Sequence, residues 1–214
     1  MVEKVYILNK LLNDIRKGID NMSSSFPRIR LNSRNFLLSI YPEFHTKLFP
    51  ESKLNNEDES IIQDTVYANS VTKVYITGMR GIDNLRIGDN LLIYRTTDGA
   101  GPARFRSVAT SVCVVADMKN INEFSSLQEF KNYCGQNTIF EEHQLDDFYQ
   151  TKRYPFIIKF RYHFSLEKRV ILNDIVDITG YDIQGTYWGF VPLNNAHFRQ
   201  ILETGQVNEG LIID

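Results

Sequence analysis

The stretch from Val71 to Ala116 constrains the fold more than any other part of the sequence. It begins with a run rich in β-branched and aromatic residues, and a second such run, Leu91–Arg95, follows the turn at Gly88 and Asp89. Glycine at this corner supplies the positive φ that a tight turn between strands needs. A glycine-rich loop and a long β-rich run complete the stretch. The pattern predicts a meander of antiparallel strands, typical of a small barrel.

Hydrophobic periodicity elsewhere predicts helices around this meander, so the expected fold class is α+β. Further strands are expected at residues 36–40, 155–164 and 188–193, the last being the final strand, and helices at 57–68, 122–134, 141–149, 173–178 and 196–202. Pro42 is expected to end the first of these strands in a turn, because proline cannot donate a ladder hydrogen bond. Lys159, Arg161 and His163 alternate with apolar residues, which predicts a solvated basic face or, alternatively, a surface for nucleic acid.

The N-terminal residues carry one apolar stripe with helical spacing. Its members are Val5, Leu8, Leu12, Ile15, Ile19 and Met22. The stripe predicts an amphipathic helix that either pairs with a second copy or a partner helix as a short coiled coil, or packs on its own domain. Pro27 follows the end of the pattern, so residues 1–26 are expected to form a helix and linker ahead of a domain over 27–214.

Composition and charge exclude several classes of function. With 24 Lys and Arg residues against 26 Asp and Glu residues, the chain lacks the basic excess that drives sequence-independent binding to phosphates. Its apolar runs are much shorter than a membrane span, and its first residues lack the pattern of a secretion signal. A cytoplasmic protein without membrane contact is therefore expected.

The residues that commonly bind metals or cofactors are few and scattered. Cys113 and Cys134 lack C-x-x-C spacing, and the four histidines lie in separate predicted elements. The glycine-rich run 97–102 joins two strands and is expected to open no helix, which favours a hairpin loop over a phosphate-binding loop. We expect no metal and no cofactor.

The turn Leu85–Asp89, with the strand Leu91–Arg95 and the longer strand Ser107–Ala116, resembles the opening of the barrel in the PUA-like superfamily, which includes the PUA, ASCH and EVE domains. Two further runs, Tyr41–Glu51 and Asn69–Tyr75, are similar to a PUA-like module that often follows an acetyltransferase domain in bacterial proteins. A loop for acetyl-CoA is not found in the sequence, so acetyl transfer is not expected.

The resemblance extends over about residues 35–205 and implies a PUA-like antiparallel β-barrel flanked by helices. It also implies a module that binds RNA or modified DNA and holds a modified or flipped base in a cleft between barrel and helices. Such a pocket needs an aromatic face for stacking and a few fixed polar groups, rather than a basic surface. The near-neutral charge of the chain suits this mode of binding.

Eight residues near the implied cleft are candidates for binding nucleic acid or another ligand: Tyr67, Asn69, Ser70, Thr72, Arg95, Thr96, Tyr187 and Trp188. Tyr187 or Trp188 is expected to stack on a base, and Asn69 to pair with a base edge. Arg95 is expected to reach a phosphate. The structural alternatives are a core anchor for Trp188, a helix cap for Asn69 with Ser70, and an acidic partner for Arg95.

An enzymatic function has weaker support in the sequence. Some ASCH relatives hydrolyse small amides with a lysine, a threonine and a glutamate, and Lys73 with Thr72 or Thr77 supplies two of these. No glutamate is suitably placed, and the ASCH signature G-x-K-x-x-E-x-R is absent, so no catalytic residue is assigned. The alternatives to nucleic-acid binding are a regulatory protein that binds a small ligand or recruits a partner, and a small-amide hydrolase.

Overall fold

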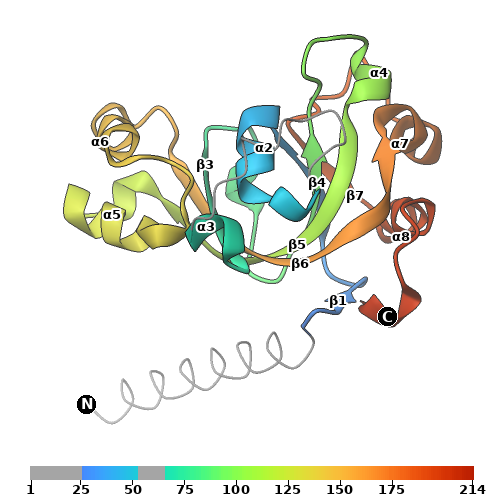
Figure 1. The fold of residues 1–214 in the computed structure, drawn as a ribbon, viewed down its shortest axis with the longest axis horizontal. Coiled ribbons are helices and arrows are strands. Elements are labelled where there is room, and N and C mark those ends of the chain that lie inside the picture. Colours follow the sequence, from blue (N-terminus) through green and yellow to red (C-terminus); the bar gives the residue numbers. More distant parts are fainter. Residues whose placement is uncertain (1–25, 53–65) are drawn as a thin grey trace.

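The computed structural model describes residues 26–52 and 66–214 (Figure 1). Its strands are β1 (Ile29–Arg30), β2 (Asn35–Ile40), β3 (Thr72–Thr77), β4 (Asn90–Arg95), β5 (Val108–Asn120), β6 (Phe156–Ile171), β7 (Phe190–Leu193) and β8 (Ile212–Ile213). Its helices are α2 (Pro42–Leu48), α3 (Val66–Asn69), α4 (Ala103–Arg106), α5 (Leu127–Cys134), α6 (Glu142–Thr151), α7 (Leu172–Thr179) and α8 (Asn195–Thr204). The amphipathic stripe expected over 5–22 and the start of the helix expected over 57–68 lie outside the described residues.

Six strands form one sheet in the order β3-β6-β5-β4-β2-β7. Every neighbouring pair is antiparallel except β2 and β4, which run parallel from Asn35 opposite Asn90 to Ile40 opposite Arg95. The α+β class with a mostly antiparallel sheet is confirmed. One pair departs from the expected antiparallel barrel: β2 and β4 are parallel, because the long connection between them, which includes β3, returns the chain to the end of the sheet where β2 began. Among the described residues, no ladder joins β3 to β7.

The two longest strands bend the sheet. The ladder between β5 and β6 shifts register between Ala109 and Ser111, between Val112 and Cys113, and between Val115 and Asp117. Such irregularities increase the local twist and bend the strands. The sheet therefore curls, with one face inside the curl and the other outside.

Each face of the sheet has its own hydrophobic core. Inside the curl, Phe49, Phe130 and Phe160 belong to a core to which α5 and α6 contribute. Outside it, Ile175 of α7 and Phe198 of α8 pack on the other face. Figure 1 shows α5 and α6 at one end of the molecule, α7 and α8 at the other, and α2 over the middle of the sheet.

Several local predictions are confirmed. β3 and β4 form where the β-rich runs lie, and Gly88 between them has a φ of 91°. α7 ends at Gly180, whose φ of 69° is the left-handed geometry of a glycine helix cap. α8 matches the helix expected last in the chain.

Other local predictions are wrong. Pro42 starts α2 rather than a turn, because proline is well tolerated in the first turn of a helix. The run 97–102 does open a helix, the four-residue α4. The strand expected over 155–164 continues to Ile171, and the strand expected to be last starts at Phe190 and is followed by β8. No helix of the described ranges is long and apolar enough to span a bilayer.

Candidate functional site

A cleft of about 1010 Å³ opens where β2, β3 and β4 end. Tyr41 directly follows β2 and Thr96 directly follows β4. Because these strands are parallel, the two residues lie at the same end of neighbouring strands. The amide of Thr96 donates a hydrogen bond of 3.1 Å to the carbonyl of Ile40, which fixes this corner. Thr77, the last residue of β3, also lines the cleft.

The cleft brings together opposite edges of the sheet. β3 is one edge strand, whereas the segment before β7, residues 186–189, belongs to the other edge. Both line the same cleft. Residues from distant strands meet here because the sheet curls, so the curl creates the site.

Aromatic side chains form the walls of the cleft. On the α6 side, the Phe140 ring centroid lies 5.5 Å from that of Phe44 and 5.1 Å from that of Phe148, and Phe148 in turn lies 5.1 Å from Tyr154. Burial raises the pKa of Tyr75 well above its usual range, so its phenol stays protonated. The cleft therefore offers fixed ring faces and, at Tyr75, a neutral phenol.

The opposite wall is held by β2. Ser39 donates from its amide to the carbonyl of Gly189 (2.9 Å) and from its hydroxyl to the carbonyl of Trp188 (2.5 Å). A Cβ at position 189 would come within 2.6 Å of the Tyr187 ring. Glycine at this position therefore lets the Tyr187 ring lie against the backbone beside the cleft.

Polar and charged side chains also line the cleft, among them Thr96, Asp147 and Arg153. The Oγ1 atom of Thr96 is buried and has no hydrogen-bond partner among residues 26–52 and 66–214. At the α6 side, Arg153 forms a 2.5 Å ion pair with Asp147, and its guanidinium lies 5.1 Å from the centre of the Tyr154 ring. The cleft thus combines stacking surfaces with one enclosed, unsatisfied hydroxyl and one cation near its wall.

Three of the eight predicted residues line this cleft, namely Thr96, Tyr187 and Trp188. The Tyr187 side chain is 42% exposed and available for contact. The Trp188 indole is more constrained, because it donates to the carbonyl of Ile183 (3.0 Å) and lies with its ring centroid 6.4 Å from that of Tyr94. Trp188 therefore also anchors the core outside the curl.

Four predicted residues lie elsewhere, at the opposite end of β3 from the cleft. Tyr67 and Asn69 belong to α3, and Thr72 starts β3. The hydroxyl of Ser70 accepts a hydrogen bond from the amide of Thr72 (3.2 Å). None of the four lines the cleft.

The eighth predicted residue, Arg95, is enclosed by the fold. Its side chain is 3% exposed and donates to the carbonyl of Thr96 (3.4 Å). The Arg95 guanidinium also helps to depress the pKa of His45, which burial and the charges of Arg95 and Arg169 lower to about 3. Arg95 as placed therefore lies inside the curl rather than at the surface of the molecule.

Lys73 is buried at the far end of β3. Its ammonium donates to the carbonyls of Tyr67 (3.0 Å) and Ala68 (2.9 Å), and burial lowers its pKa. Thr77 lines the cleft, but Lys73 does not. The pair Lys73 and Thr77 considered for a hydrolase is therefore not assembled in the cleft.

The basic face expected on β6 is only partly solvated. His163 is buried, donates from Nδ1 to the carbonyl of Pro27 (2.9 Å), and has a pKa lowered by burial. Lys159 lies with its ammonium 3.7 Å from the centre of the Tyr133 ring. Both residues pack against neighbouring elements, which the alternation of β6 alone did not indicate.

The cleft residues that sequence reasoning missed are mainly aromatic: Tyr41, Phe44, Tyr75, Phe140, Phe148 and Tyr154. They come from separate elements, and their sequence neighbourhoods carry no shared motif. Within the described ranges, no group of three or more His, Cys, Asp or Glu side chains is arranged to hold a metal ion.

Comparison with known proteins gives structural matches only. No family model and no curated protein matches the sequence. The ASCH protein from Zymomonas mobilis is similar over 79% of this chain and 94% of its own, with 12% identity and a TM-score of 0.47. Human THYN1, solved with 5-methylcytosine-containing DNA, is similar over 82% of this chain and 99% of its own, with 11% identity and a TM-score of 0.41. Protein Atu2648 from Agrobacterium tumefaciens is similar over 81% and 93%, with 11% identity and a TM-score of 0.45.

The ASCH structures and the THYN1 domain are PUA-like. The similarity concerns the path of the chain over about four fifths of its length, and no residue's role follows from it.

Proposed function

We propose that this protein is a nucleic-acid-binding module that holds an unstacked base of RNA or modified DNA in the aromatic cleft. The observation that carries the proposal is the gathering of exposed aromatic side chains around one hollow. Tyr41, Tyr154 and Tyr187 line the cleft and are three of the seven exposed large hydrophobic side chains among the described residues. Rings held in water beside a cavity are suited to stack on a planar ligand.

The polar groups of the cleft fit the edge of a base. Thr96 Oγ1 is a donor and acceptor without a partner, and an enclosed hydroxyl left in this state is unfavourable unless a ligand satisfies it. Thr77 and Gln144 add further polar groups to the lining. A base that stacks on the tyrosines and bonds to Thr96 would satisfy both kinds of surface.

The charge of the protein favours binding of a base in a pocket over binding of the nucleic-acid phosphates. The net charge is −2, so binding through many phosphates is not supported. We therefore expect affinity to depend strongly on the base and only weakly on salt. The THYN1 structure was solved with 5-methylcytosine-containing DNA, which makes that base a useful probe here.

The test is a binding screen with fluorescent single- and double-stranded DNA and RNA, plain and modified, at about 50 and 200 mM salt. Tyr187→Ala is expected to weaken binding of the best ligand by about 1–3 kcal/mol, the usual cost of losing one stacking ring. Thr96→Val keeps the shape of the side chain but removes the hydroxyl, and should reduce discrimination between bases.

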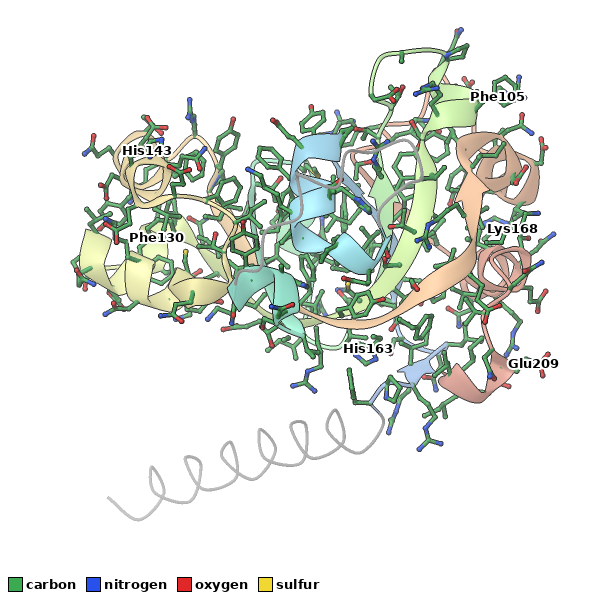
Figure 2. All side chains as sticks on the ribbon, viewed as in Figure 1. Phe105, Phe130, His143, His163, Lys168 and Glu209 are labelled. Carbon is green, nitrogen blue, oxygen red and sulfur yellow. The ribbon has the colours of Figure 1, made fainter. Side chains whose placement is uncertain are left out.

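Phe105→Ala is the matched control. Phe105 is 60% exposed and lies on α4, far from the His143 side of the cleft (Figure 2). Its removal should leave binding unchanged. The proposal fails when the wild type binds no oligonucleotide, or when Tyr187→Ala and Phe105→Ala lose equal affinity. Equal affinity for a free nucleoside and an oligonucleotide would instead support the small-ligand alternative.

A further inference from the structure

A second hollow lies directly beside the cleft. It is a groove of about 540 Å³ between the connection that follows β3 and the edge strand β7. Thr186 and Tyr187 line both hollows. Tyr187 is therefore the ridge that separates the cleft from the groove.

The floor of the groove is apolar and close-packed. The rings of Phe36 on β2 and Phe190 on β7 stack with centroids 4.8 Å apart and an interplanar angle of 14°. Gly81, with a φ of 88°, turns the chain above Phe190, and a Cβ there would lie 3.5 Å from the Phe190 ring. The turn brings the neighbouring Arg80 to the rim.

Two arginines border this floor. The Arg80 guanidinium carbon lies 4.8 Å from the centre of the Tyr187 ring, and no carboxylate pairs with Arg80 within the part of the chain that the structure describes. Arg34 lies 5.2 Å from the centre of the Phe36 ring, and Asp89 holds it through bonds of 2.9 Å from Nε and 2.5 Å from Nη2. Arg34 is thus largely neutralised, whereas Arg80 offers a full charge on the ridge.

We infer that the groove holds the nucleotide next to the base bound in the cleft, and that Arg80 contacts the phosphate that joins the two. This inference rests on the proposed function. A strand with one base in the cleft and the next residue in the groove must cross Tyr187, where the Arg80 guanidinium lies. A guanidinium stacked on an aromatic ring is restrained before binding, so it loses less freedom on meeting a phosphate.

The occupant is therefore a single-stranded or locally unpaired segment. An intact duplex keeps its bases stacked, whereas two neighbouring hollows separated by a ring require the two nucleotides to be splayed apart. One unpaired arginine at the crossing matches one phosphate. The groove extends the site from a base pocket to a dinucleotide site.

The test compares single strands of one, two and four nucleotides, built around the base that binds most tightly in the oligonucleotide screen. The wild type is expected to gain affinity from one to two nucleotides and little beyond. Arg80→Gln should lower the affinity gained from the second nucleotide about tenfold. It should also reduce the slope of log affinity against log salt by about 0.7, the value for one phosphate contact of a single strand. Thermal unfolding should not change, because Arg80 is exposed.

The control is Arg86→Gln. Arg86 is exposed on the same connection between β3 and β4 and lines neither hollow. It should leave the length dependence and the salt slope as in the wild type. If the wild type binds, but Arg80→Gln shows the same gain in affinity from one to two nucleotides and the same salt slope, the groove assignment alone is overturned. Failure of the wild type to bind any of the strands overturns the proposed function as well.

Discussion

The two faces of the curled sheet differ in how completely they are covered. Outside the curl, α7 and α8 place Ile175, Phe198 and Ile201 on the strands and close a hydrophobic core. Inside it, α2, α5 and α6 cover most of the core but leave the cleft open at the strand ends. The inner face also carries buried polar residues, including His45 and Lys73. The outer face therefore forms a closed core, whereas the inner face leaves a cleft open where a ligand would bind.

Substitution of one large ring on each face is the strongest way to test this division. Phe198→Ala removes a fully buried ring from α8 and is expected to lower the free energy of unfolding by about 3–5 kcal/mol. Phe148→Ala, in the cleft wall, should also destabilise the fold but should weaken base binding in addition. Chemical denaturation and oligonucleotide titration of both variants measure the two effects.

The difference between these variants lies in binding. Under conditions in which Phe198→Ala is still folded, it should bind as the wild type does. A loss of affinity as large as that of Phe148→Ala would mean that the outer core also shapes the cleft, and would contradict the division of the two faces.

The pH dependence of stability provides a second test, directed at the inner face. His45 has a pKa of about 3 in the folded protein, against 6.5 for the unfolded chain. Above pH 6.5 the residue is neutral in both states; as the pH falls, only the unfolded chain takes up the proton. Each pH unit below 6.5 should therefore lower the free energy of unfolding by about 1.4 kcal/mol, which amounts to roughly 2.7 kcal/mol at about pH 4.5.

His45→Gln isolates this contribution from that of other groups. The variant keeps a side chain able to bond to Thr110, whose Oγ1 lies 2.8 Å from His45 Nε2. Its unfolding free energy should fall less steeply between neutral and acid pH than that of the wild type. Parallel pH curves for the two proteins would show that His45 is not kept neutral by the fold.

Lys73 allows the two ends of β3 to be compared. Lys73→Met keeps the apolar stem but leaves the carbonyls of Tyr67 and Ala68 without their donor, which should cost about 1–3 kcal/mol in unfolding free energy. Base binding should be unchanged, because Lys73 does not line the cleft and its ammonium is bound to the carbonyls of α3. Lys47→Met, on an exposed lysine of α2, is the matched control. Loss of binding in Lys73→Met alone would place the ligand at the wrong end of β3.

The sequence predicted elements well where local chemistry decides them. The β-rich runs of β3 and β4 and the glycine at position 88 needed no distant partner, and all are confirmed. The site was harder to predict from the sequence, because it depends on the curl of the sheet, which brings residues 186–189 beside the end of β3. Tyr67 and Thr77 are close in sequence, yet only Thr77 lines the cleft. The burial of Lys73 also depends on tertiary packing, which no local pattern indicated.

The smallest expected effect on stability belongs to Tyr41, at the mouth of the cleft. Tyr41 is 60% exposed and occupies the N-cap position of α2 without a side-chain cap hydrogen bond. Tyr41→Ser should leave the unfolding free energy within about 0.5 kcal/mol or raise it slightly, because serine is a favoured N-cap residue. Loss of the ring should nevertheless weaken base binding by about 1–3 kcal/mol. A variant that is as stable as the wild type but binds the best oligonucleotide less tightly would separate the ligand-binding role of the cleft from its part in the fold. Unchanged affinity would remove Tyr41 from the stacking surface and leave Tyr154 and Tyr187 to supply it.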